Sequence, residues 1–259
     1  MIHAFGEAIA FMRTRPIVVV GMAIIILLQA GIALLQLPVA SYFLSVLDFN
    51  TLIDAFGGIQ LAGFFILLLI GMIVNFTGFL WVAQHVKAWK LHSGEKTSLQ
   101  LIKSAGLVAA AIILVGGLML GLTWVLTAIV DAIGFFALLL LGVMVLLAFY
   151  LTIKFLFVLP LMGFGLGLKQ ALQQSWHITQ EHFFASAALL IGLFIVTAVI
   201  DFITQTLLVG IDADIIVVPL NFIIAVLLST YSAAVVACAI PLQEVDTIPH
   251  PKHAHGKAK

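Results

Sequence analysis

Six long apolar runs, separated by shorter polar stretches, divide this chain of 259 residues. A helix needs about 20 apolar residues to cross the hydrocarbon layer of a bilayer, and each run meets that length. The alternating period of a barrel strand is absent, and unpaired backbone groups are too costly in lipid, so every span should be helical. We place the spans at residues 17–36, 60–82, 104–128, 133–157, 184–208 and 215–240.

Two connecting segments show the period of an amphipathic helix. From Ser41 to Phe56, polar residues recur at every third or fourth position and apolar residues fill the remaining surface. This pattern predicts a helix lying on the outer membrane surface, or in part a cap over the bundle. Residues 166–183 have a similar pattern and predict an interfacial helix between the fourth and fifth spans. The residues on one face of that helix are Leu168, Leu172, Trp176 and Thr179.

The positive charges identify the two sides of the membrane, because cytoplasmic loops are the ones rich in Lys and Arg. All 11 fall on one side of the six-span topology, so both termini should be cytoplasmic. They are Arg13, Arg15, Lys87, Lys90, Lys96, Lys103, Lys154, Lys169, Lys252, Lys257 and Lys259.

Composition agrees with an all-α, polytopic membrane protein. Hydrophobic residues make up 64% of the chain and charged residues 8%, whereas a soluble domain has roughly a quarter charged residues. We divide the chain into a transmembrane domain at residues 1–242 and a disordered cytoplasmic tail at residues 243–259. Three histidines of the tail are potential metal ligands, but nothing preorganises them, so no metal site is predicted. They are His250, His253 and His255.

The charges and cysteines limit the classes of function. A net charge of zero argues against a nucleic-acid partner, which needs a concentrated basic surface. The single Cys238 lies inside an apolar run and forms no internal disulfide. A metal-dependent hydrolase needs carboxylates and histidines that converge on one site. Here the aspartates of the outer side lie in four separate segments and the histidines on the cytoplasmic side, so we predict no catalytic residue, no cofactor and no enzymatic activity.

Three polar residues within spans form a candidate intramembrane site. Asp201 lies in the fifth span, and a carboxylate at the centre of a bilayer costs about 2.5–3.5 kcal/mol, so such groups tend to mark function. Water or Gln205 near the outer interface, or a hydrogen bond to another span, are the alternatives for Asp201. Asn75 and Asn221 lie in the second and sixth spans, where amides commonly bond between helices. Ligation of a substrate is the alternative for both amides.

A second candidate site lies at the cytoplasmic end of the fourth span. The long stem of Lys154 allows its ammonium group to reach the headgroups, where it would contact a lipid phosphate. Trp176 suits a membrane boundary because its ring is apolar and its N–H is polar. With Lys169 and Ser175, these residues are our candidates for contact with lipid or a partner.

The segment from Thr152 to Phe184 carries a family resemblance. It has a basic residue late in a span, then a proline, then Ala-Leu followed by Ser-Trp, and a threonine ahead of an aromatic residue. The positions are Lys154, Pro160, Ala171, Leu172, Ser175, Trp176, Thr179 and Phe183, and an Arg-Pro pair, Arg15 and Pro16, precedes the first span. This pattern resembles the membrane domain of glycerophosphoryl diester phosphodiesterases and related six-span proteins of the bacterial inner membrane.

The resemblance implies a location in the bacterial inner membrane but no catalysis, because the phosphodiesterase domain of some relatives is missing. Residues 161–167 also lack the acidic connector often found in the family. We therefore expect a non-catalytic scaffold or accessory protein that contacts membrane lipids, or another membrane protein, through the segment around Trp176. The alternative is a transporter of small solutes or lipids with a cavity near Asp201.

Overall fold

The computed structural model describes residues 3–45, 49–91, 100–113, 135–208 and 214–241. Side chains are described for these residues except for 37–62, 135–141, 207–208 and 214–216. The predicted tail at residues 243–259 lies outside the described part. Within the described residues the chain is helical and contains no strand, which confirms the all-α prediction.

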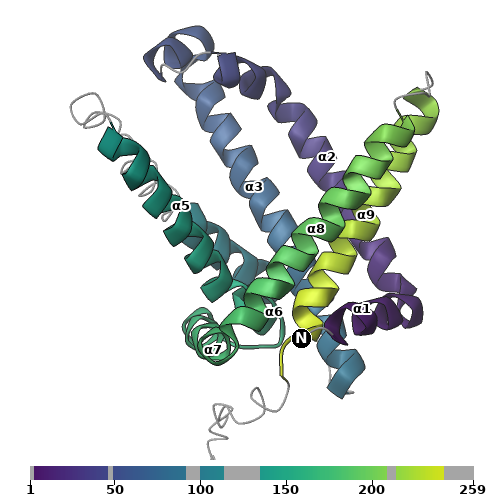
Figure 1. The fold of residues 1–259 in the computed structure, drawn as a ribbon. Helices are drawn as coiled ribbons and strands as arrows, with labels where there is room; N and C mark the ends of the chain where they lie inside the picture. Colours follow the sequence, from purple (N-terminus) through teal and green to yellow (C-terminus); the bar gives the residue numbers. More distant parts are fainter. Residues whose placement is uncertain (1–2, 46–48, 92–99, 114–134, 209–213, 242–259) are drawn as a thin grey trace, which may run out of the picture.

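Eight labelled helices and one unlabelled helix make up the described structure (Figure 1). The labelled helices are α1 (His3–Thr14), α2 (Pro16–Ser45), α3 (Phe49–Leu91), α5 (Phe135–Phe155), α6 (Val158–Gly163), α7 (Leu168–Glu181), α8 (Phe183–Leu208) and α9 (Asp214–Cys238). The unlabelled helix is Gln100–Ile113.

Five described segments are long and apolar enough to cross a membrane. They are Pro16–Gln36, Gly63–Leu91, Gly142–Gly163, Phe183–Thr206 and Val217–Cys238. These segments correspond to five of the six predicted spans, so the chain has the architecture of a multi-pass membrane protein. The remaining predicted span, 104–128, begins within the helix Gln100–Ile113, and its second part lies outside the described residues.

The two predicted surface helices have different outcomes. The first, from Ser41 to Phe56, is divided between the end of α2 and the start of α3. Its side chains lie outside the described part, so its amphipathic character stays a prediction. The second is confirmed as a helix, α7, and its interfacial location stays a prediction. Its buried face, however, contains small and polar residues as well as apolar ones, because it packs closely against the other helices. The buried residues are Ala171, Ser175, Ile178 and Thr179.

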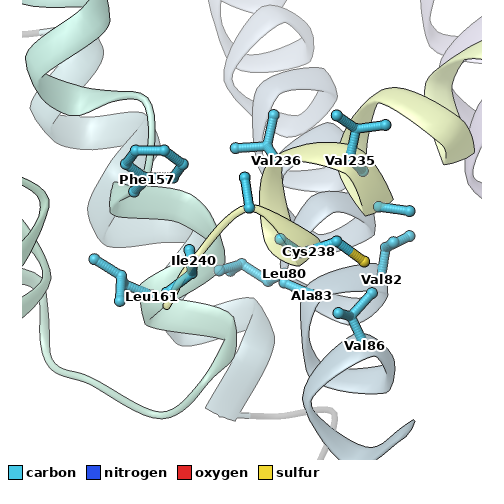
Figure 2. Packing of buried hydrophobic residues seen from close by; sticks show 14 of the residues in the cluster. Leu80, Val82, Ala83, Val86, Phe157, Leu161, Val235, Val236, Cys238 and Ile240 are labelled. Atoms are coloured by element: carbon cyan, nitrogen blue, oxygen red, sulfur yellow. The ribbon is translucent and has the colours of Figure 1, made fainter. Parts of the chain in front are cut away.

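The buried core lies at one end of the molecule. It joins α1, the beginning of α2, the last turns of α3, the helix Gln100–Ile113, α6, α7, the first half of α8 and the second half of α9. Figure 2 shows Leu161 of α6 beside Ile240, which follows α9, with Leu80 of α3 next to them. From this end the α2–α3 hairpin, α5 and the α8–α9 pair diverge (Figure 1). All described lysines and arginines belong to segments that begin or end here, so we call it the Lys-rich end.

A glycine allows α6 to lie very close to α3 in this core. A Cβ atom on Gly163 of α6 would lie 2.7 Å from the Cβ of Ala83 and 2.8 Å from the carbonyl oxygen of Leu80. Real Cβ atoms do not approach backbone so closely, so any larger residue would push α6 away from α3. The small residue at position 163 therefore sets the distance between the two helices.

The end of α6 is a Schellman motif. The N–H of Leu166 donates to the carbonyl of Leu161 and the N–H of Gly165 to that of Met162. Gly165 has a φ of 115°, a conformation that glycine adopts without steric cost. This turn reverses the chain and directs α7 back across the end of α5.

Two lysines of α3 add hydrogen bonds to carbonyl groups at helix ends. Lys87 Nζ donates to the carbonyl of Phe164, at a distance of 2.6 Å, just after α6. Lys90 Nζ donates to the carbonyl of Cys238, at 2.9 Å, at the end of α9. The last four carbonyls of a helix have no partner within the helix, and a cation there also meets the negative end of the helix dipole. Both lysines therefore help to hold the Lys-rich end together.

Candidate contact site around Lys154 and Trp176

A buried hydroxyl fixes α7 against the end of α5. Ser175 Oγ donates a hydrogen bond of 2.7 Å to the carbonyl oxygen of Lys154, and Ser175 is fully buried. Lys154 is in the last turn of α5, where carbonyl groups lack partners within the helix. The hydroxyl of Thr179 in turn donates to the carbonyl of Ser175, at 2.8 Å. The buried face of α7 thus has its polar groups paired.

The ammonium group of Lys154 lies between two aromatic rings. Its Nζ is 4.6 Å from the ring centroid of Trp176 and 5.6 Å from that of Tyr150, within the range of cation–π contacts. The two rings meet edge to face, with centroids 6.3 Å apart. The sequence predicted a lysine that extends to the headgroups. In the structure Lys154 is 4% exposed, because α7 folds over the end of α5 and places Trp176 against it, and contact with the headgroups stays a prediction.

Two further aromatic residues extend this cluster. Phe155 lies next to Trp176, with ring centroids 6.4 Å apart, and Phe183 lies next to Tyr150, at 5.9 Å. Tyr150 and Phe155 were not among the predicted site residues. The sequence could have indicated Tyr150, because it lies four residues before Lys154 and residues at this spacing share a helix face.

The outer side of this cluster is open. Trp176 is 41% exposed and Leu172, one turn before it on α7, is 36% exposed. Lys169, the other predicted contact residue, lies exposed in the first turn of α7 and has no described contact with the rings. The structure therefore brings together three of the four predicted contact residues, Lys154, Ser175 and Trp176, and leaves Lys169 apart.

The residues of the predicted intramembrane site lie on three helices. Asn75 belongs to α3, Asp201 to α8 and Asn221 to α9, and each is exposed. In the described part of the chain no hydrogen bond joins any two of them, and neither cavity described below contains one of them. Because each residue lies on an outward face of its helix, the described structure shows no site that the three residues share.

A cavity of about 460 Å³ opens at the Lys-rich end. Its ionisable groups come from separate elements: His3 and Glu7 from α1, Lys90 from α3, His182 from the junction of α7 and α8, and Cys238 from the end of α9. Lys90 Nζ forms an ion pair with Glu7 at 2.5 Å. The sequence did not predict this cavity, because no helix was expected ahead of the first span.

A smaller cavity, about 210 Å³, has an almost entirely apolar lining. It lies between α2, α3 and the helix Gln100–Ile113, and includes Gly21, Thr77 and Trp81. Among the described residues, no group of three or more His, Cys, Asp and Glu has the arrangement of a metal site.

Comparisons of this chain with protein-family models, with curated proteins and with solved structures found no match. The resemblance to the membrane domain of glycerophosphoryl diester phosphodiesterases therefore stays a prediction from the segment between Thr152 and Phe184.

Proposed function

We propose that this chain is a non-catalytic scaffold or accessory protein of the bacterial inner membrane. In this proposal the Lys-rich end and both termini are cytoplasmic. The protein contacts membrane lipid, or another membrane protein, through the exposed rim of α7 that contains Leu172 and Trp176, which we call the α7 rim.

The observation that carries this proposal is the division of α7 into a fixed face and an open rim. On the fixed face, Ser175 is fully buried and bonded to α5, and Ile178 is fully buried as well. On the rim, Leu172 and Trp176 expose more than a third of their surface. A rigidly held surface that presents a tryptophan and an aliphatic side chain suits recognition, since such a surface loses little conformational entropy on binding.

The position of the rim supports contact with the membrane or with a protein embedded in it. The rim adjoins the last turns of α5, which belong to the membrane-length segment Gly142–Gly163. Tryptophan is favoured at this depth because its ring is apolar and its N–H is polar. The neighbouring Phe184, at the start of α8, is 87% exposed, so an apolar surface continues from the rim onto the next span.

The transporter alternative depends on a cavity shared by Asp201, Asn75 and Asn221. Each of these residues is exposed on a different helix, and no described cavity includes them. The exposed positions of these residues therefore favour the contact proposal over transport.

Photo-crosslinking in intact cells tests the contact proposal. A photoreactive amino acid in place of Leu172 should give covalent adducts with phospholipid or with one discrete membrane protein. The matched control is the same amino acid in place of His177, which lies on the exposed side of α7, with a side chain 60% exposed. The proposal fails if position 172 gives no adduct, or if position 177 gives the same adducts in the same yield.

A further inference from the structure

We propose that Lys154, Tyr150 and Trp176 bind the phosphate group of a membrane phospholipid. This inference rests on the proposed function, because it identifies the ligand that part of the α7 rim would recognise.

Within the described residues, the ammonium group of Lys154 has no hydrogen-bond acceptor. It carries three N–H donors and no acceptor of its own. In the described part of the chain no carboxylate lies within ion-pairing distance of it, and its described partners are the rings of Tyr150 and Trp176. The residue is 4% exposed, so water replaces the missing acceptors only in part. A buried charge without hydrogen-bond partners is costly, which favours a ligand that supplies oxygen atoms.

The two rings add further donors to the same cluster. The indole N–H of Trp176 is a donor only, and the phenol O–H of Tyr150 is a donor as well as an acceptor. The described residues supply neither group with a hydrogen-bond partner, and both side chains are more than a third exposed. A cation and two neutral donors in one cluster match a group with several anionic oxygens, and phosphate has this character.

The surroundings favour a lipid as the source of the phosphate. A soluble phosphate compound would leave the apolar side chains around the cluster in water. Phe155, Leu172 and Phe184 are all exposed beside it, around the end of α5, which belongs to the membrane-length segment Gly142–Gly163. Acyl chains attached to the phosphate would cover these side chains in the adjoining hydrocarbon layer.

Native mass spectrometry of the purified full chain in mild detergent tests this inference. The probes are dioleoyl phosphatidylglycerol, dioleoylglycerol as a matched lipid without phosphate, and inorganic phosphate. We expect wild type to retain phosphatidylglycerol, and Lys154→Met to lower its apparent affinity by about tenfold or more, because a charge-assisted hydrogen bond is lost. Tyr150→Phe, which removes only a hydroxyl group, should lower the affinity by a smaller factor. Lys154→Arg should retain most of the binding.

The control is Lys103→Met, which removes one exposed positive charge from the helix Gln100–Ile113. It should leave the affinity unchanged. The inference is overturned if Lys154→Met and Lys103→Met behave alike, or if dioleoylglycerol binds as well as the phospholipid. It is also overturned if inorganic phosphate alone competes at the same concentration, since the ligand would then be a soluble phosphate. If the photoreactive amino acid at position 172 gives adducts but Lys154→Met leaves the lipid affinity unchanged, the proposed function stands. Only the phosphate site at Lys154 is then refuted.

Discussion

Single residues determine close contacts at the Lys-rich end. Gly163 lies where a Cβ atom would meet the backbone of α3, and Ser175 bonds a carbonyl that the end of α5 leaves free. Ser175 was predicted as a site residue with the help of a family resemblance, but the reason for its position is a contact between residues 21 positions apart. Gly163 gave no signal, because glycine is common in membrane spans. Contacts of this kind depend on the tertiary arrangement.

Substitution of Gly163 with alanine should destabilise the protein by about 1–3 kcal/mol, because the added methyl group overpacks the contact with Ala83 and Leu80. Gly142→Ala is the matched control in the same membrane-length segment, since nothing lies within 4 Å of the position that its added methyl group would occupy. Thermal unfolding in detergent measures the difference. Equal midpoints for the two variants would contradict the close approach of α6 to α3.

Ser175→Ala should cost about 1–3 kcal/mol, because it leaves the buried carbonyl of Lys154 without its partner. The comparison variant is Thr206→Ala on α8, whose hydroxyl bonds only to its own helix, at the carbonyl of Phe202. Limited proteolysis should show faster cleavage near α7 in Ser175→Ala alone. Identical cleavage in both variants would show that the hydroxyl does not fix α7.

At the scale of elements, the periodicity of the sequence was most informative for α7 and for the long spans. It predicted α7 within two residues at each end and placed Leu172 and Trp176 on one side of the helix. It did not predict that Ala171 and Ser175 would face the core, because apolar patterning does not distinguish a lipid-facing side chain from a buried one. The short helix α6 was not predicted either. It continues the fourth span after a break at residues 156–157, and Pro160 fits its first turn.

Lys90→Met tests whether α1, α3 and α9 are joined through one ammonium group. The substitution removes the ion pair with Glu7 and the hydrogen bond to the carbonyl of Cys238, so we expect a loss of about 1–3 kcal/mol. Lys103→Met, a change of the same charge at an exposed position, should stay within about 0.5 kcal/mol of wild type. Denaturant unfolding measures the stability of both variants. If Lys90→Met loses as little stability as Lys103→Met, the ammonium group does not join the three helices.

At the scale of the whole molecule, the buried core and the positive charges lie at the same end. The core, two lysine-to-carbonyl contacts and the α7 rim all lie there, while the spans diverge from it and expose long apolar surfaces (Figure 1). The one-sided distribution of Lys and Arg could be predicted directly from the sequence, because it requires only the order of the spans. The gathering of α1, α6 and α7 at this end could not, since it depends on contacts between distant segments.

The charge distribution predicts which side of the membrane this end occupies. In a Cys238→Ala background, His177→Cys should be protected from a membrane-impermeant maleimide in spheroplasts and should react after permeabilisation. Gln36→Cys, at the opposite end of the membrane-length segment Pro16–Gln36, should react without permeabilisation. The reverse pattern would place the Lys-rich end outside and refute the orientation.

The central claim is that the molecule acts through the α7 rim and not through an intramembrane polar site. Native mass spectrometry of the protein extracted with its endogenous lipids tests it most directly, by comparing wild type with Trp176→Ala and Asp201→Asn. The account predicts a bound lipid or partner that is lost in Trp176→Ala and retained in Asp201→Asn. A small ligand that is lost only in Asp201→Asn would contradict it and would favour transport.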